Sequence, residues 1–215
     1  MLTLAKYALR GPYHAATIVG VLVTAGVFFP LISTNALLSL MISSTLVLVA
    51  AILVGLIILT QGSVSGLKAI SVAIIGITLV ATIVLKEPAL GISVGLAQWL
   101  PIVILAQSLR TTNSLAAMLL AGVVLAGIGI GAQYLIWPEI EAEWVQQVEA
   151  AGEQMQESMP YGQAGMLENL PIFIHWMVLS LGSFAYMLVI SIMLLARWIQ
   201  AKIAGSDGFS REFQA

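Results

Sequence analysis

Cysteine is absent from this chain of 215 residues, which excludes disulfides, thiolate metal sites and cysteine nucleophiles. Charge is scarce as well: charged residues make up 8% of the chain, whereas ordinary soluble domains carry about 25%. The 8 Lys and Arg are outnumbered by 10 Asp and Glu, so the chain has no basic field to hold nucleic-acid phosphates. We therefore predict that it has no nucleic-acid partner.

Long apolar runs take the place of these missing groups. Hydrophobic residues make up 60% of the chain and the mean hydropathy is +1.04, which excludes a soluble catalytic domain and a disordered scaffold. A helix needs about 20 apolar residues to cross about 30 Å of hydrocarbon. The sequence therefore predicts an all-α fold, a polytopic transmembrane helix bundle in the lipid bilayer that forms a single domain over residues 1–215. Its six predicted spans are about 15–33, 36–60, 67–85, 89–107, 115–137 and 171–197.

The region 31–60 is long for one span and contains several hydroxyl side chains, among them Ser39, Ser43 and Ser44. One interpretation is a long, tilted or partly interfacial helix, which would need no break in the chain. The other interpretation is a short re-entrant piece followed by a span. The sequence leaves both open.

Lys and Arg are distributed unevenly between the two sides of a bundle with six spans. Only Lys86 falls on the side away from the termini. Cytoplasmic loops are enriched in Lys and Arg, so we expect both termini in the cytoplasm. The seven cations on that side are Lys6, Arg10, Lys68, Arg110, Arg197, Lys202 and Arg211.

The middle of each predicted span lacks Asp, Glu, Lys and Arg. This absence disfavours proton transport through a buried carboxylate and also voltage sensing. His14 and His175 begin different spans on opposite sides of the membrane, so they cannot share a haem, and neither has a second ligand at a helical spacing. We predict no cofactor and no metal. We also predict no enzymatic activity, because no nucleophile, base and orienting acid can be placed at one depth.

A few polar and aromatic side chains do lie within the spans. Gln98 and Trp99 precede Pro101, which cannot donate to the carbonyl group four residues earlier and so frees an acceptor near mid-span. This group suits a small neutral solute. The same pocket would be lined from later spans by Gln133, Tyr134 and His175. The alternative is that all these side chains only form hydrogen bonds between helices.

Small residues recur at a spacing of four on three of the spans, which places them on one helix face and lets a neighbouring helix approach closely. The three faces are Ala16, Gly20 and Thr24; Gly91 and Gly95; and Gly127 and Gly131. They serve either internal packing or docking to a membrane protein partner or a second copy of the chain.

The segment 139–159 between the fifth and sixth spans is predicted to form an amphipathic outer helix. Its polar positions are rich in Glu. The helix is either a lid over an external pocket or an inert interfacial helix. Its apolar stripe, at steps of three and four, is Ile140, Trp144, Val148, Ala151, Met155 and Met159.

The carboxyl-terminal segment 198–215 follows the last span as an amphiphilic cytoplasmic tail. The residues of the tail and of the end of the span that form a recognisable pattern are Ala196, Arg197, Trp198, Gln200, Ala201, Gly208, Phe209, Glu212 and Phe213. This pattern resembles the ending of an uncharacterised family of bacterial inner-membrane proteins, the YybS-like proteins, with Ile199, Ser210 and Arg211 as departures. The resemblance implies the bacterial inner membrane and a fold like that of the substrate-binding components of energy-coupling-factor transporters, in which the face of Ala16 would dock to a coupling subunit.

Two functions agree with these features. One is a protein associated with transport that binds a small, neutral or weakly polar solute. The family resemblance slightly favours this function. The other is a membrane scaffold or assembly protein that acts through its glycine faces and through Phe209 and Phe213 of the tail. The sequence does not reveal the solute or the oligomeric state.

Overall fold

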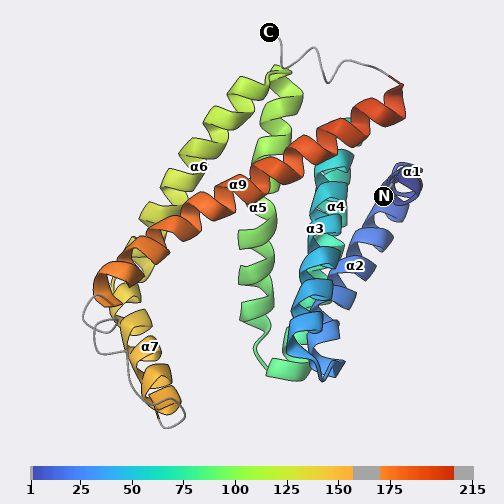
Figure 1. Cartoon of the computed structure of the whole chain (residues 1–215). Helices are drawn as coiled ribbons and strands as arrows, with labels where there is room; N and C mark the ends of the chain where they lie inside the picture. The colour runs from blue at the N-terminus through green and yellow to red at the C-terminus, as the bar shows by residue number, and fades with distance from the viewer. Residues whose placement is uncertain (1, 157–169, 206–215) are drawn as a thin grey trace. The chain divides into compact units, whose positions relative to one another are not determined.

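The computed structural model describes residues 2–156 and 170–205, and all regular structure in these residues is helical (Figure 1). Six helices, α2, α3, α4 with η1, α5, α6 and α9, are long and apolar enough to cross a membrane. The prediction of an all-α membrane protein with six spans is therefore confirmed. The elements are α1 Leu2–Ala8, α2 Pro12–Ile32, α3 Ala36–Gln61, α4 Ser63–Val80, the π-helical turn η1 Ala81–Leu85, α5 Pro88–Thr112, α6 Leu115–Ile136, α7 Ile140–Gln156 and α9 Leu170–Ala204.

Short turns set the ends of the helices. The side chain of Asn35 accepts a hydrogen bond from the backbone N–H of Leu38 at 3.0 Å and caps α3. Gly62 separates α3 from α4 with a φ of 99°, a conformation that residues with a Cβ rarely adopt. Because α3 is one unbroken helix over Ala36–Gln61, the region 31–60 contains the end of α2, a turn and a single span rather than a re-entrant piece.

The helices form two compact units, which are described separately. Unit 1 comprises Met1–Gly122 and Val189–Ala215, and unit 2 comprises Val123–Leu188. Unit 1 therefore holds α1 to α5 and unit 2 holds α7, while α6 and α9 each contribute one part to each unit.

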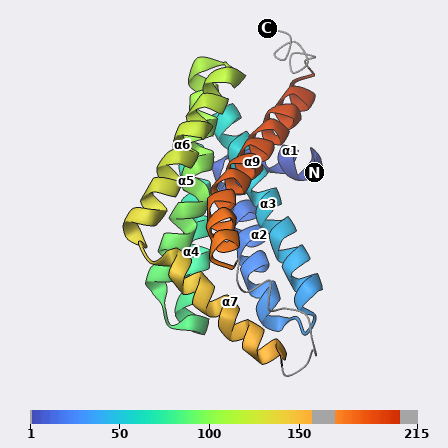
Figure 2. The same cartoon turned by 60° about the vertical axis from the view of Figure 1, so that its left-hand side comes forward.

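The core of unit 1 is built on α3, where every residue from 50 to 59 is buried. α3 packs against α2, α4 and α5, and α4 also packs against α2 and α5 (Figures 1 and 2). A Cβ added at Gly55 would lie 3.3 Å from both the Sδ of Met193 and the Cβ of Ala196. The glycine thus lets the last part of α9 approach α3 closely.

Unit 2 contains the segment predicted as an amphipathic helix over 139–159, and the structure describes helix α7 over Ile140–Gln156. Ile140 of its apolar stripe is buried in a small cluster with Ile174 and Val178 of α9. The next two stripe residues, Trp144 and Val148, are 38% and 36% exposed. The side chains of Ala151, Met155 and Met159 lie outside the described part of the structure.

Candidate functional site

The small residues of α2 lie against α4 within unit 1. A Cβ at Gly20 would lie 2.9 Å from the Cγ1 of Val72, and a Cβ at Gly76 would lie 2.5 Å from the Oγ1 of Thr24. Ala16 is buried one turn before Gly20. The face that the family resemblance would assign to a coupling subunit is therefore in contact with α4 of the same unit.

The small residues of α5 also lie against α4. A Cβ at Gly91 would lie 2.6 Å from the Cα of Thr78, which is backbone and cannot turn aside. A Cβ at Gly95 would lie 2.9 Å from the Cγ1 of Ile74. Both glycines allow α4 and α5 to pack at a distance that larger side chains would prevent.

The glycines of α6 have a different environment. A Cβ added at Gly127, Gly129 or Gly131 would meet no described atom of unit 2 within 4 Å. Elsewhere in the same unit a glycine does form a close contact, because a Cβ at Gly182 of α9 would lie 2.5 Å from the Cγ1 of Ile130. Ile130 marks the side of α6 that meets α9, and the Gly127 and Gly131 face is open with respect to the described atoms of unit 2.

The predicted solute group on α5 lies in unit 1, with Gln98 half-buried and Trp99 only 1% exposed. Among the described residues, the Nε1–H of Trp99 has no hydrogen-bond acceptor. An unpaired buried donor costs about 1–3 kcal/mol, so this indole can gain energy from any acceptor that reaches it. Pro101 lies inside the same helix two residues later and has no backbone N–H.

The structure brings two of the other predicted residues together in unit 2. The hydroxyl of Tyr134 at the end of α6 donates to the Oε1 of Glu141 on α7, at 2.5 Å. The Nδ1 of His175 on α9 lies 2.8 Å from the same oxygen. One carboxylate thus joins three helices, while Gln133 is half-buried beside Tyr134 in sequence.

The surroundings of Glu141 favour its ionised form. The hydrogen bond from Tyr134 lowers the pKa of the Glu141 carboxyl below its usual 4.5, and the hydrogen bond to His175 acts in the same direction. The carboxylate is therefore charged at neutral pH and accepts hydrogen bonds from both neighbours. Its contribution to stability is present above the usual pKa and is lost as the pH falls through the lowered value.

Polar side chains gather at the end of unit 1 where α3 meets α4, which we call the Arg110 end. The Nε2 of Gln61 donates to the carbonyl oxygen of Leu9 at 3.0 Å and so ties α3 to the segment after α1. The hydroxyl of Ser63 donates to the Oε1 of Gln107 and joins α4 to α5. The guanidinium group of Arg110 lies over Gly62, where a Cβ would collide with it.

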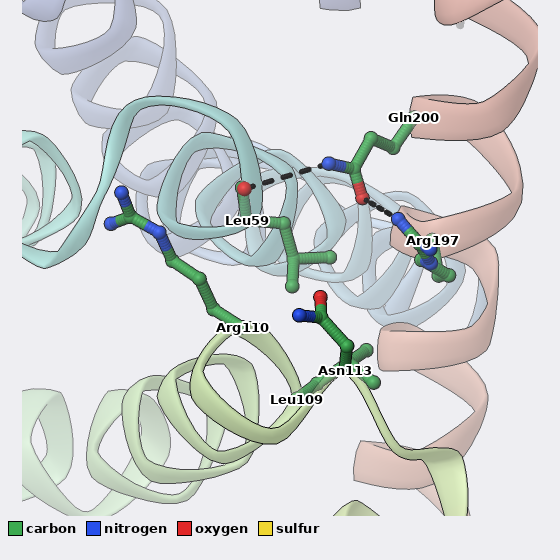
Figure 3. Close-up of a pocket in the computed structure, with 6 residues that line it drawn as sticks. All are labelled: Leu59, Leu109, Arg110, Asn113, Arg197 and Gln200. Atoms are coloured by element: carbon green, nitrogen blue, oxygen red, sulfur yellow. Dashed lines mark hydrogen bonds between the residues drawn. The ribbon is translucent and has the colours of Figure 1, made fainter.

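A small cavity of about 40 Å³ opens at this end (Figure 3). Arg197 and Gln200 approach it from α9, and the Nη1 of Arg197 donates to the Oε1 of Gln200 at 2.7 Å. The Nε2 of Gln200 donates to the carbonyl oxygen of Leu59 at 3.5 Å, which links α9 to α3. The residues that line the cavity are Leu59, Leu109, Arg110, Asn113, Arg197 and Gln200.

The predicted tail motif is thus divided by the structure. Arg197, Trp198 and Gln200 belong to α9, which continues to Ala204. The Nζ of Lys202 lies 5.7 Å from the centre of the Trp198 ring, within range of a cation–π contact. The remaining motif residues, Gly208, Phe209, Glu212 and Phe213, lie outside the described residues.

Comparison of the chain with protein-family models, with curated proteins and with solved structures finds no match. The six apolar helices therefore establish a multi-pass membrane protein in contact with lipid, and the family assignment stays a prediction.

Proposed function

We propose that this protein is a non-catalytic membrane protein that assembles with a second copy of itself through α6. The observation that carries the proposal is the open face of Gly127 and Gly131, in contrast to the other two small-residue faces, which are filled by α4. Small residues at a spacing of four let two membrane helices approach closely, and the same face on two copies is self-complementary.

The neighbours of these glycines favour helix association. Exposed apolar residues lie on the same side of α6 as the two glycines by helical geometry, and their side chains form ridges beside the groove that the glycines leave. Each glycine costs about 1 kcal/mol of helix propensity relative to alanine, and no contact in unit 2 offsets that cost. Contact with another helix would offset it. The exposed ridge residues are Val123, Val124, Ile128 and Leu135.

The absence of cysteine makes the test direct, since a disulfide between two copies of the chain can form only through the introduced thiol. We expect Ile128→Cys to form a disulfide-linked dimer in native membranes under mild oxidation, because its Cβ would lie near the contact. Ala185→Cys, at an exposed position of α9, is the matched control and should stay monomeric.

A second pair of variants tests the glycines themselves. Gly127→Leu with Gly131→Leu should abolish the Ile128→Cys dimer, whereas Ser183→Leu with Ala185→Leu adds the same bulk at exposed α9 positions and should leave it intact. Equal crosslinking at positions 128 and 185, or a monomer in lipid nanodiscs at all concentrations, would contradict the proposal.

Solute binding is the second candidate, and the unpaired, buried indole of Trp99 favours it. A neutral solute with an acceptor atom could bind beside Gln98 and Pro101 and satisfy that donor. Native mass spectrometry of the protein in its own lipids should then detect a non-lipid adduct that is lost in Trp99→Phe, which keeps an aromatic ring but removes the N–H. An empty chain in both forms would contradict solute binding.

We propose further that the protein resides in a bacterial inner membrane with both termini in the cytoplasm. The uneven distribution of Lys and Arg supports this orientation, and the resemblance of the tail to YybS-like proteins supports the membrane type. A membrane-impermeant thiol reagent added to intact cells should label Lys86→Cys and leave Lys68→Cys unlabelled. The reverse pattern would overturn the orientation.

A further inference from the structure

We infer that the outer side of α1 binds the headgroups of anionic phospholipids. α1 packs against α2 and α3, and its inward face is formed by Ala5 and Ala8, which are both fully buried. Lys6 and Tyr7 lie on the opposite side of this helix and are exposed. What we call the α1 surface comprises four exposed side chains, those of Lys6, Tyr7, Arg10 and His14.

The α1 surface lies at the depth of the lipid headgroups. The span formed by α2 begins at Pro12, directly after Arg10, and the span formed by α3 ends at Gln61. The Nε2 of Gln61 donates to the carbonyl oxygen of Leu9 at 3.0 Å, which holds the segment after α1 level with the end of α3. α1 itself has seven residues, whereas a helix needs about 20 to cross the hydrocarbon. It therefore lies at the boundary between hydrocarbon and water, at one end of α2 (Figure 1).

Aromatic rings hold the cation of Arg10 in place without neutralising it. The Cζ of Arg10 lies 5.8 Å from the centre of the Tyr7 ring, within range of a cation–π contact. The Tyr7 ring meets the ring of His14 edge to face, with their centres 5.0 Å apart. Neither ring carries a negative charge, so the guanidinium group keeps its positive charge for the oxygen atoms of a phosphate. Tyrosine also favours the headgroup region of a bilayer.

No described carboxylate competes with a lipid for these cations. Among the described residues of unit 1, Glu87 is the single acid, and it lies beyond the far end of α4. Neither Lys6 nor Arg10 forms an ion pair with a described residue. Lys68 of α4 and Lys202 of α9 add to the positive field at the same end of unit 1. The charge of this end is therefore complementary to a lipid whose headgroup has a net negative charge.

The open form of the α1 surface favours a lipid over a soluble anion. Its cations are exposed, so salt screens their attraction for a dissolved ion. A phospholipid is kept at headgroup depth by its own acyl chains, which gives it a high local concentration beside α1. The α1 surface belongs to unit 1, so the inference does not depend on the glycine face of α6 in unit 2.

The experiment titrates the full chain, stripped of bound lipid, with phosphatidylglycerol or phosphatidylcholine and measures binding by native mass spectrometry. Each cation beside an anionic lipid contributes about fivefold to affinity, so Lys6→Gln with Arg10→Gln should weaken the tightest binding of phosphatidylglycerol by about tenfold or more. Binding of phosphatidylcholine, which has no net charge, should be nearly unchanged. Lys6→Arg with Arg10→Lys keeps both charges and should bind phosphatidylglycerol as the unaltered chain does.

The matched control is Lys68→Gln with Lys202→Gln, which removes the same charge from the same end of unit 1 and leaves the α1 surface intact. It should weaken phosphatidylglycerol binding by less than about threefold. Equal losses in the two glutamine variants would assign binding to the overall charge of this end and would overturn the inference. So would equal binding of the two lipids to the unaltered chain, or a loss in the variant that keeps both charges.

Inorganic phosphate is the third probe, because it carries the same oxygen atoms without acyl chains. We expect it to leave phosphatidylglycerol binding unchanged at physiological ionic strength. Displacement of the lipid by phosphate, with the same dependence on Lys6 and Arg10, would identify a soluble anion as the ligand and would overturn the assignment to lipid.

Discussion

α5 and α6 carry the same pattern, two glycines four residues apart, but the two helices use it differently. Gly91 and Gly95 of α5 meet the backbone of Thr78 and the side chain of Ile74 on α4. Gly127 and Gly131 of α6 meet nothing within 4 Å in unit 2. The spacing of two glycines four residues apart therefore indicates that another helix can approach closely. It does not indicate which helix makes that contact.

Burial of the spans follows the same division. In α3, at the centre of unit 1, 56% of the most apolar 18-residue stretch is buried inside the protein, and in α6 the share is 11%. Unit 1 is held by close apolar contacts among five helices. Among its described residues, unit 2 is held by the contact of Gly182 with Ile130, one small apolar cluster and the hydrogen bonds of Glu141, so it should be the less stable of the two.

The largest expected effect comes from filling the contact of α5. Gly91→Leu should destabilise the protein by about 3 kcal/mol, because its side chain would meet the backbone of Thr78 and force α4 away. Gly127→Leu, with the same added bulk at an open position, should leave monomer stability nearly unchanged. Unfolding in mixed micelles followed by circular dichroism measures both. Equal losses would show that the two faces are not different.

The second largest effect, a loss of protection in α7, should be confined to unit 2. Glu141→Gln removes the charged acceptor shared by Tyr134 and His175, and we expect backbone hydrogen exchange over Ile140–Gln156 to rise several-fold at neutral pH. Glu139→Gln is the matched control at an exposed neighbouring position.

The same link gives a pH dependence with a defined sign. The pKa of Glu141 is lowered in the folded protein, so the unaltered chain should keep α7 protected at neutral pH and lose that protection as the pH falls below 4.5 through the lowered value. The Glu141→Gln variant should show no such step. A step of equal size in the variant would assign the pH dependence to another group.

A smaller effect of opposite sign is expected on α6. Gly129→Ala should stabilise the protein by about 1 kcal/mol, since alanine is the better helix former and its Cβ has open space in unit 2. Gly95→Ala should instead destabilise it, because Ile74 occupies the space. The same unfolding assay compares the two substitutions. A loss of stability in Gly129→Ala would mean that the side of α6 on which Gly129 lies is covered.

The smallest effect tests a polar contact inside unit 1. The hydroxyl of Ser43 on α3 donates to the carbonyl oxygen of Gly26 on α2 at 2.7 Å. Ser43→Ala should cost about 0.6 kcal/mol, the usual value of one hydrogen bond between membrane helices. Ser44→Ala, whose hydroxyl bonds within its own helix to Met41, should cost less. A cost above that of Gly91→Leu would contradict the primacy of apolar packing in unit 1.

Much of the fold could be predicted from the sequence, because the bilayer imposes a length on each apolar run. Six spans and the amphipathic α7 follow from hydropathy and from the stripe that begins at Ile140. The unbroken α3 was one of the two interpretations that the sequence left open, because Ser43 and Ser44 also allowed a break. In the structure these hydroxyls bond to carbonyl oxygens of Gly26 and Met41, so they lie in a helix without breaking it.

The candidate site was less accessible from sequence. Tyr134 and His175 were selected as polar residues within spans, but Glu141 looked like one more acid on the polar face of an outer helix. The cavity that Arg110 and Arg197 help to line was also missed, because each residue alone looks like an ordinary cation at a helix end. Hydropathy fixes how deep a residue lies, whereas the rotation of each helix, which decides these contacts, depends on packing with distant segments.

The length of α9 affects how the protein fits its membrane. Its 35 residues extend about 52 Å at 1.5 Å per residue, whereas the hydrocarbon core of a typical bilayer is about 30 Å thick. The helix must tilt, carry its ends into the headgroups or thicken the lipid around it. Each of these adjustments changes with acyl chain length. α9 therefore makes the protein sensitive to bilayer thickness, and a membrane of the wrong thickness would act on both units, because α9 contributes a part to each.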